Sequence, residues 1–407
     1  MVDPLLDELL TQVSAVMITG PRASGKTTLA SRRAATIVHL NAKAQAAAFE
    51  ADPDAALRDL EEPVLLDEWQ EVPGVFGAAR RAVDADPRPN RFYLTGSVRA
   101  EHDNEIWPGT GRFVRLPMYP MTVRERHGGT AAKAFLDKLA EGEALTVPAD
   151  SPDLRGYVEL SMESGFPNAA LLLSDRPRRM WLRSYVEDLL THDVEELEEP
   201  ATKHRDSERL RRYFEAYALN SAGAADHKTI YEAAGVNKRT AAEYERLLTR
   251  LLVLDQVPAW ASNRLKRLVH TPKRYVVDSA LITTALRLTS QGVLGDGDLL
   301  GRVLDTFVVG QLRAETIGAE SEPRLFHLRT EAGRHEVDVL VELGGQRVIG
   351  IEVKAAAAPT SGDAKHLRWL QGELGDRFVV GVVLHTGPRV YELADGIIAA
   401  PISTLWG

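Results

Sequence analysis

Short, largely apolar runs alternate with longer amphipathic or Ala-rich stretches in the first part of the chain. The runs cover residues 15–18, 37–40, 64–66 and 92–95, and polar or turn-forming residues bound each of them. Continuous apolar runs of this length are typical of parallel strands that are buried on both faces. The pattern predicts an α/β domain over 1–127 that is built on a parallel sheet.

The pattern changes twice beyond this first domain. Residues 128–208 combine a Gly/Ala/Glu-rich stretch, Pro148 and Pro152 with a long amphipathic helix, which predicts a helical connector. Residues 209–280 contain short helices and a hairpin pattern. Residues 281–407 are predicted as a helix, then strands, a helix and a strand. We therefore expect a helical and winged-helix module followed by a second α/β domain.

The bulk composition indicates a cytoplasmic protein of several domains. A chain of 407 residues is too long for one ordinary core, and its net charge of -9 argues against a generally basic nucleic-acid coat. The absence of cysteine excludes disulfides and Cys-ligated zinc and fits a reducing compartment. The first residues carry no basic region before an apolar core, and no apolar run approaches the roughly 20 residues that a bilayer requires. We expect no membrane partner.

A glycine-rich stretch separates the first predicted strand from the first helix. Gly20 and Gly25 have P-loop spacing, and they let successive backbone N–H groups point into one concavity that fits a phosphate. The positive end of the following helix adds to this attraction. Lys26 is placed to reach the β- and γ-phosphates, and Thr27 to ligate Mg²⁺. An ordinary Gly-rich turn is the alternative. The predicted nucleotide-binding residues of this loop are Gly20, Pro21, Arg22, Ala23, Ser24, Gly25, Lys26, Thr27 and Thr28.

Polar residues also end the later buried strands. Asp67 and Glu68 follow the run 64–66, at the edge where parallel sheets bind ligands. Asp67 is the expected residue of the Mg²⁺ shell, and Glu68 is the candidate base that orients water towards the γ-phosphate. Ser97 ends the next strand, where a P-loop ATPase keeps a residue that senses the γ-phosphate. A solvated acidic turn is the alternative for Asp67 and Glu68.

Arg112 follows a Gly-rich turn and precedes the predicted strand 113–116. It is a candidate catalytic contact to the γ-phosphate, in its own subunit or in a neighbouring one. A surface ion pair is the usual role of an isolated arginine, and we leave both interpretations open. A role in the neighbouring subunit would require a homo-oligomer.

Several of these motifs resemble one known family. The P-loop, Leu-Leu-Asp-Glu-Trp-Gln at 65–70, Leu-Thr-Gly-Ser at 94–97, and Gly-Arg at 111–112 with residues 116–125 look like the AAA-type ATPase domain of a broad prokaryotic group. Its members carry a C-terminal domain of unknown function, and residues 301–312, 329–338, 352–354 and 401–406 agree with it. The resemblance implies an ATPase that uses ATP and Mg²⁺.

The helix–turn–helix pattern of the middle module carries positive charge. Asn237 is the expected N-cap of its second helix, and residues 253–257 and 274–277 are predicted as wing strands. Ten Lys or Arg stand against five Asp or Glu between 226 and 274. Winged helices bind DNA through such residues, but they also serve as protein-interaction modules, and both roles are open. The candidate DNA contacts are Lys238, Arg239, Arg264, Lys266 and Arg267.

The last module contains a pattern that resembles the metal-dependent nuclease fold known by its Asp…Asp/Glu-x-Lys motif (PD-(D/E)xK). Asp338 and Glu352 lie on two predicted adjacent strands, and Lys354 points to the same face as Glu352. The two carboxylates are candidates to share one Mg²⁺, with Asp305 as the acid of the preceding helix. An active nuclease, the same fold without cleavage, and coincidental hairpin charges are the three interpretations.

The sequence as a whole predicts an ATP-hydrolysing P-loop protein. We expect its nucleotide state to control DNA or protein binding by the C-terminal modules. A DNA nuclease that ATP regulates and a nucleotide-gated interaction switch without DNA contact are the alternatives.

Overall fold

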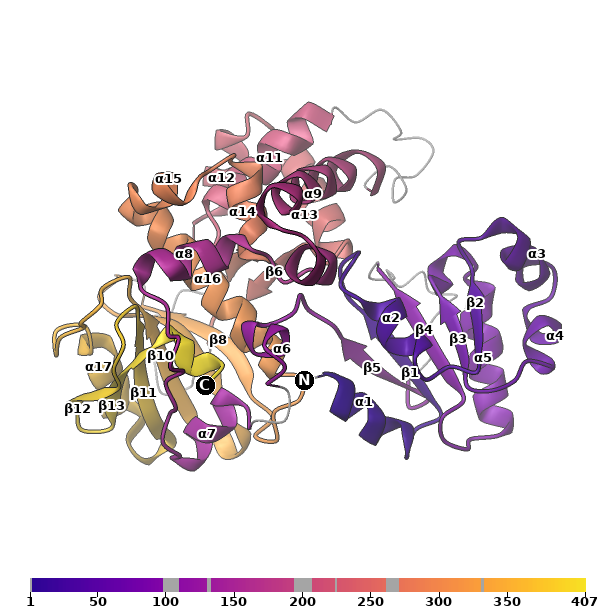
Figure 1. The fold of residues 1–407 in the computed structure, drawn as a ribbon, viewed down its shortest axis with the longest axis horizontal. Coiled ribbons are helices and arrows are strands. Elements are labelled where there is room, and N and C mark those ends of the chain that lie inside the picture. Colours follow the sequence, from indigo (N-terminus) through magenta and orange to yellow (C-terminus); the bar gives the residue numbers. More distant parts are fainter. Residues whose placement is uncertain are drawn as a thin grey trace. The chain divides into compact units, whose positions relative to one another are not determined.

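The computed structural model describes residues 2–97, 110–129, 133–193, 207–223, 225–260, 271–330 and 333–407. The chain divides into two compact units. The first consists of Met1–Tyr119 with Thr249–Leu252, and the second of Pro120–Leu248 with Val253–Gly407. In Figure 1 the strands of the first unit are indigo to purple, and the C-terminal sheet of the second is orange to yellow.

A parallel five-stranded sheet forms the centre of the first unit. Its order is β2-β3-β4-β1-β5, and every neighbouring pair is parallel. The sheet and the strands that the apolar runs predicted are confirmed. The strands are β1 (Ala15–Thr19), β2 (Thr36–His39), β3 (Val64–Asp67), β4 (Phe92–Gly96) and β5 (Phe113–Pro117).

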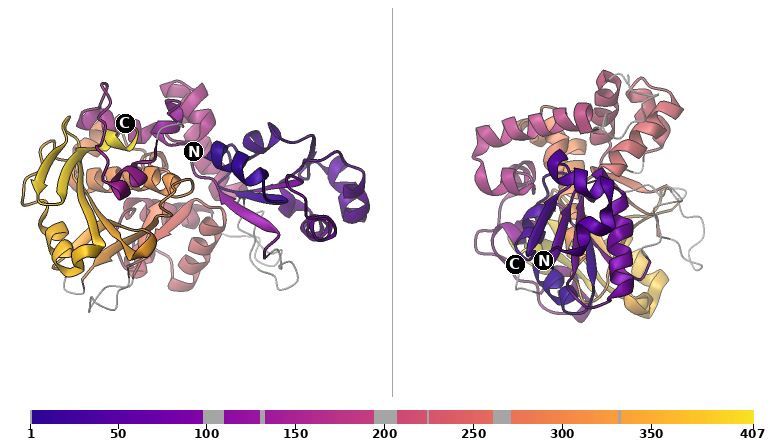
Figure 2. Two further views of the ribbon diagram at one scale, coloured as in Figure 1. Left: turned by 90° about the horizontal axis from the view of Figure 1, so that it is seen from below. Right: turned by 90° about the vertical axis from the view of Figure 1, so that its right-hand side faces the viewer.

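Both faces of this sheet are buried, which explains why its strands are apolar at successive positions. On one face Met17 and Leu66 share a core with Phe76 of the helix after β3. Val16 and Leu65 point to the other face and are fully buried as well. Figure 2 shows helices on both sides of these strands. The helices are α1 (Val2–Leu10), α2 (Lys26–Ser31), α3 (Lys43–Ala51), α4 (Pro53–Arg58) and α5 (Gly74–Ala85), with a 3₁₀ turn at Trp69–Glu71.

The second unit begins with helices. Two helices and a hairpin occur where the sequence predicts them. Asn237 precedes the second of these helices, and its Oδ1 accepts a hydrogen bond from Thr240 N (3.0 Å). In the hairpin, β6 (Leu254–Val257) pairs antiparallel with β7 (Lys273–Val276). The predicted boundaries at 208 and 280 fall inside this unit and stay predictions. Its helices up to this hairpin are α6 (Val123–Arg126), α7 (Phe135–Glu141), α8 (Leu154–Met162), α9 (Asp175–Asp188), α11 (Ser207–Leu219), α12 (His227–Ala233) and α13 (Lys238–Arg250), with π-helical turns at Asn168–Leu172 and Leu189–Asp193.

A mixed six-stranded sheet of order β12-β13-β11-β10-β9-β8 completes the second unit. The pairs β10–β11 and β11–β13 are parallel, whereas the others are antiparallel. Leu367 and Leu370 of α17 pack on one face of this sheet. Its strands are β8 (Arg324–Arg329), β9 (Glu336–Glu342), β10 (Val348–Val353), β11 (Phe378–His385), β12 (Tyr391–Ala394) and β13 (Ile397–Pro401), and the helices are α14 (Ser279–Ala285), α15 (Ser290–Leu294), α16 (Gly297–Glu315) and α17 (Lys365–Leu374). Short 3₁₀ turns lie at Gly344–Gln346, Gly375–Arg377 and Ile402–Leu405.

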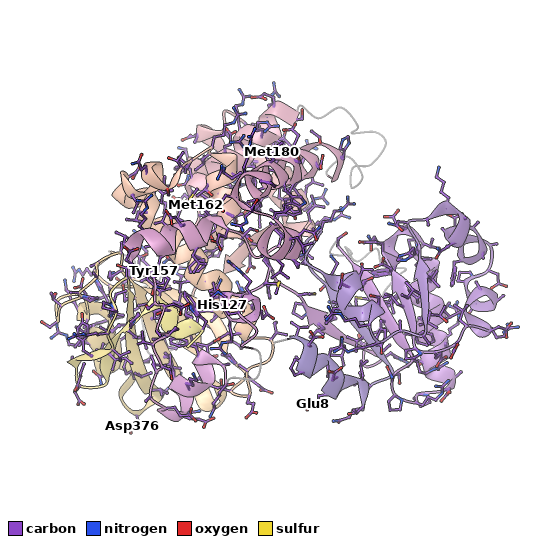
Figure 3. The ribbon with its side chains drawn as sticks, viewed as in Figure 1. Glu8, His127, Tyr157, Met162, Met180 and Asp376 are labelled. Carbon is purple, nitrogen blue, oxygen red and sulfur yellow. The ribbon has the colours of Figure 1, made fainter. Side chains whose placement is uncertain are left out.

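Buried polar contacts connect distant segments within the second unit. The hydroxyl of Tyr157 on α8, labelled in Figure 3, accepts a hydrogen bond from Ser403 N (2.9 Å). On α16, Glu315 lies 3.1 Å from Arg124 of α6 and accepts hydrogen bonds from the backbone N–H groups of Phe135 and Leu136. Burial raises the pKa of Glu315 to about 7, although Arg124 acts in the opposite direction. No helix in the described ranges is both long and apolar enough to cross a membrane.

Candidate functional site

The loop between β1 and α2 turns sharply at two positions. Ala23 and Gly25 have positive φ angles of 61° and 94°, a left-handed conformation that turns the chain sharply. A Cβ atom on Gly20 would lie 2.3 Å from the Met118 carbonyl oxygen, so only glycine fits at this position. The Ser24 hydroxyl is buried and has no hydrogen-bond partner among the described residues. The loop therefore contains a buried hydroxyl without a partner that could donate a hydrogen bond to an oxyanion.

Lys26 is the first residue of α2 and its side chain is buried. Its Nζ donates a hydrogen bond to the carbonyl oxygen of Pro21 (2.9 Å), across the loop. Burial lowers the pKa of Lys26 to about 8, while the carboxylates of Glu68 and Asp67 act to raise it. A buried ammonium that donates to a neutral carbonyl oxygen would form a stronger, charge-assisted hydrogen bond with a phosphate oxygen.

Asp67 connects the loop to three strands. Its Oδ1 accepts hydrogen bonds from the hydroxyls of Thr27 (2.7 Å) and Thr95 (2.5 Å). Its Oδ2 lies 3.0 Å from Nδ1 of His39, the last residue of β2. No motif in the sequence singles out His39. His39 is the polar residue of the 37–40 run, and the parallel pairing of β2 with β3 brings it into register with Asp67.

Glu68 follows β3 in a left-handed conformation, with φ 54° and ψ 51°. This conformation is unfavourable for a residue with a side chain and indicates a functional constraint. Its Oε2 accepts hydrogen bonds from Gln70 Nε2 (2.6 Å), Ser97 Oγ (3.1 Å) and Ser97 N (3.3 Å). Among the described residues, none donates a hydrogen bond to Oε1. Ser97, predicted to sense the γ-phosphate, thus lies beside the predicted base.

The arrangement fits ATP and Mg²⁺. The loop N–H groups, Ser24 and Lys26 would hold phosphate oxygens, and the Thr27 hydroxyl and Asp67 would hold Mg²⁺, which neutralises phosphate charge. The structure brings together the predicted residues Gly20 to Thr28, Asp67, Glu68 and Ser97, through the contacts between Lys26, Thr27, Asp67 and Glu68.

Arg112 does not join this site within its own chain, so that interpretation is wrong. It immediately precedes β5, whose first residue, Phe113, pairs with Ala15 at the start of β1. The P-loop follows the other end of β1, and the parallel register therefore puts Arg112 at the opposite edge of the sheet. There Arg112 Nε donates to Asp84 Oδ1 (2.7 Å), and both side chains are exposed. A role in a neighbouring subunit stays a prediction.

The candidate DNA contacts are divided between described and undescribed parts of the chain. Lys238 begins α13, and Arg239 beside it is largely exposed, with its Nε 3.5 Å from Glu243. Arg264, Lys266 and Arg267 lie outside the described residues. DNA contact by this module stays a prediction.

The predicted metal-ligating acids of the C-terminal unit gather around a lysine. We call Lys273, Asp305, Asp338, Glu352 and Lys354 the Lys273 cluster. Lys273 Nζ lies 3.0 Å from Asp338 Oδ1 and 3.4 Å from Asp305 Oδ2, and Lys354 Nζ lies 2.8 Å from Glu352 Oε2. The part of the chain that the structure describes, which includes this cluster, has no group of three or more His, Cys, Asp or Glu disposed to hold a metal ion. That Asp338 and Glu352 share one Mg²⁺ stays a prediction.

The charges of the Lys273 cluster depend on one another. Burial alone would lower the pKa of Lys273, but Asp338 and Asp305 outweigh it and hold this pKa well above its ordinary value. Burial acts to raise the pKa of Asp338, but Lys273 and Lys354 overcome it and lower the pKa. Lys273 was not predicted as a site residue, because nothing local to it in the sequence indicates these distant partners.

Comparison with known proteins agrees with the site in the first unit. Residues 12–127 match the family model described as an AAA domain. The first unit has a P-loop NTPase fold. Residues 154–292 and 300–405 match two domains of unknown function, DUF8612 and DUF4143.

Relatives of the whole chain are also found. Uncharacterized proteins of Mycobacterium bovis and Mycobacterium tuberculosis are each 27% identical over 402 residues, covering 97% of this chain and 82% of theirs. A Walker-type ATPase of Pyrococcus abyssi aligns with a TM-score of 0.42 at 15% identity, covering 70% of this chain and 95% of that one.

Proposed function

We propose that the first unit binds ATP with Mg²⁺ and hydrolyses it. The hydrogen bond from the P-loop Thr27 to Asp67 at the end of β3 carries the proposal, because it joins the loop to the acid that a P-loop ATPase requires. The match of residues 12–127 to an AAA domain supports it.

In the proposed reaction the chain positions the reactants and moves one proton. Lys26 and the loop N–H groups bind the phosphates and balance the charge of the transition state. Glu68 accepts a proton from water, whose oxygen attacks the γ-phosphorus while the bond to the β-γ bridging oxygen breaks. Inorganic phosphate and ADP are the products. Glu68 Oε1 is the oxygen for this step, because Oε2 already accepts the hydrogen bonds of Gln70 and Ser97.

We further propose that the nucleotide state controls binding by the second unit. The basic residues Lys238 and Arg239 at the start of α13 favour DNA as the partner, and a protein partner is the alternative. The nuclease alternative is not favoured, because Lys273 lies between the acids that would hold its metal.

Phosphate release from ATP tests the proposal. We expect the wild type to release phosphate with Mg²⁺ and Lys26→Ala to release none. Equal rates from the two proteins would overturn the assignment.

The same assay with added DNA tests the partner: stimulation that is lost in Lys238→Ala/Arg239→Ala favours DNA, and no response to DNA favours a protein. A specific activity that rises with protein concentration, and that Arg112→Ala abolishes, would indicate an oligomer in which Arg112 acts on its neighbour.

A further inference from the structure

The Lys273 cluster is a buried site whose centre is an ammonium group. Lys273 is the first residue of β7, and its side chain is only 2% exposed. Its Nζ contacts carboxylates from two other elements, Asp305 on α16 and Asp338 on β9, and lies 3.9 Å from Glu336. A buried cation between carboxylates is strongly held, because removing either partner leaves an uncompensated charge.

The carboxylate oxygens of Asp338 and Asp305 already have hydrogen-bond donors. Asp338 Oδ1 accepts a hydrogen bond from Lys273 Nζ, and Oδ2 accepts one from the backbone N–H of Val353 (3.1 Å). Asp305 Oδ1 accepts the Tyr275 hydroxyl (3.3 Å), and Oδ2 accepts Lys273. A divalent ion shared by Asp338 and Glu352 would have to displace Lys273 or lie beside its positive charge.

One atom of the cluster has no partner. Glu352 is buried on β10, where Oε2 accepts Lys354 and Oε1 has no hydrogen bond within the described residues. A buried carboxylate oxygen without a hydrogen bond is unusual and calls for an explanation, such as a cation bound beside it. Asp338, the other acid that would bind such a cation, is already paired with Lys273.

We propose that the Lys273 ammonium is the resident cation of this cluster and takes the place of a divalent metal ion. The cluster contains three carboxyl groups, and the ammonium groups of Lys273 and Lys354 pair with all three of them. The C-terminal sheet therefore binds no divalent cation at Asp338 and cleaves no nucleic acid. This proposal is independent of ATP hydrolysis.

Manganese binding without nucleotide tests the proposal directly. The number of Mn²⁺ ions bound per chain, measured by electron paramagnetic resonance, is expected to be the same in the wild type and in Asp338→Asn. Lys273→Met, which keeps an unbranched side chain without the charge, is expected to gain one bound Mn²⁺ per chain. Adding Asp338→Asn to Lys273→Met should remove this ion. Any ion bound at the P-loop is common to all four proteins and cancels in the comparison.

Three results would overturn the proposal. One is a loss of bound Mn²⁺ from the wild type on Asp338→Asn, and another is a folded Lys273→Met that gains no ion. The third is Mn²⁺-dependent cleavage of plasmid DNA by the wild type that stops in Asp338→Ala. If Lys273→Met is too unstable to assay, the comparison of wild type with Asp338→Asn and the cleavage assay still decide.

Discussion

Ser97 donates a hydrogen bond to Glu68 from its hydroxyl and another from its backbone N–H. The residue at the end of β4 therefore fixes the carboxylate at the end of β3, next to the P-loop. This contact, together with Gln70, explains how Glu68 is held in one orientation despite its left-handed backbone. A water-activating role for Glu68 leads to the first two predictions.

Replacing Glu68 by Gln is expected to leave ATP binding intact and to lower turnover by about 10²–10⁴-fold. The amide keeps the shape of the side chain but cannot accept a proton from water. Equilibrium binding of a fluorescent ATP analogue and steady-state phosphate release measure the two effects. Hydrolysis at the wild-type rate would show that Glu68 is not the base.

Ser97→Ala is expected to lower kcat by roughly tenfold with little change in KM, because one hydrogen bond that orients Glu68 is lost while the phosphate contacts remain. Phosphate release over a range of ATP concentrations separates the two parameters. Thr11→Ala, which removes an exposed hydroxyl bonded to Glu8 O at the end of α1, is the matched control and should change neither. A rise in KM alone would point instead to direct contact between Ser97 and the nucleotide.

Nucleotide affinity is expected to fall as the pH rises above about 8. The pKa of Lys26 is lowered to about 8 by burial, so the free protein holds a charged Lys26 at pH 7 and a mostly neutral one at pH 9. Because phosphate binding requires the charged form, Kd should rise about tenfold per pH unit beyond the pKa. Titrations of a fluorescent ATP analogue between pH 7 and pH 9 measure this slope. In Lys26→Arg the slope should vanish, since a guanidinium stays charged; the same slope in both proteins would refute the role of Lys26.

Glu315 is expected to make the second unit less stable as the pH rises from about 4.5 to about 7. Its pKa is about 7 in the folded protein and lies near 4.5 when unfolded, so the folded state binds the extra proton within this range. The free energy of unfolding should fall across the range by up to about 3 kcal/mol more in the wild type than in Glu315→Gln. Urea unfolding of both proteins at pH 5 and pH 7.5 gives this double difference. Parallel pH dependences would mean that Glu315 does not titrate as its burial implies.

The sequence predicts the first unit well because its signals are local. A strand, a P-loop and a helix follow each other without interruption, and the acids at 67–68 directly end a buried strand. The contact of His39 with Asp67 and the position of Arg112 depend on strand order and register, which no local pattern encodes. Arg112 follows a glycine turn typical of a phosphate site, yet parallel pairing of β5 with β1 carries it to the other edge.

The C-terminal prediction shows the same limit. The strands of Asp338 and Glu352, and their antiparallel pairing through a Gly-rich turn, follow from alternation and turn residues. The charge that decides the site's chemistry comes from Lys273, which precedes Asp338 by 65 residues along the chain. Only the packing of β7 with α16 and β9 brings them together.

The same ion pairs constrain how this protein can be truncated. A cut between β7 and α16, such as one at the predicted boundary 280/281, would separate Lys273 from Asp305 and Asp338. One fragment would contain two buried acids without their counter-ion, and the other a lysine without its acids. Loss of function after deletion of the C-terminal residues would therefore report misfolding of the piece that is left. The hairpin β6–β7 and the sheet that follows therefore form one folding unit, which has to be expressed or deleted as a whole.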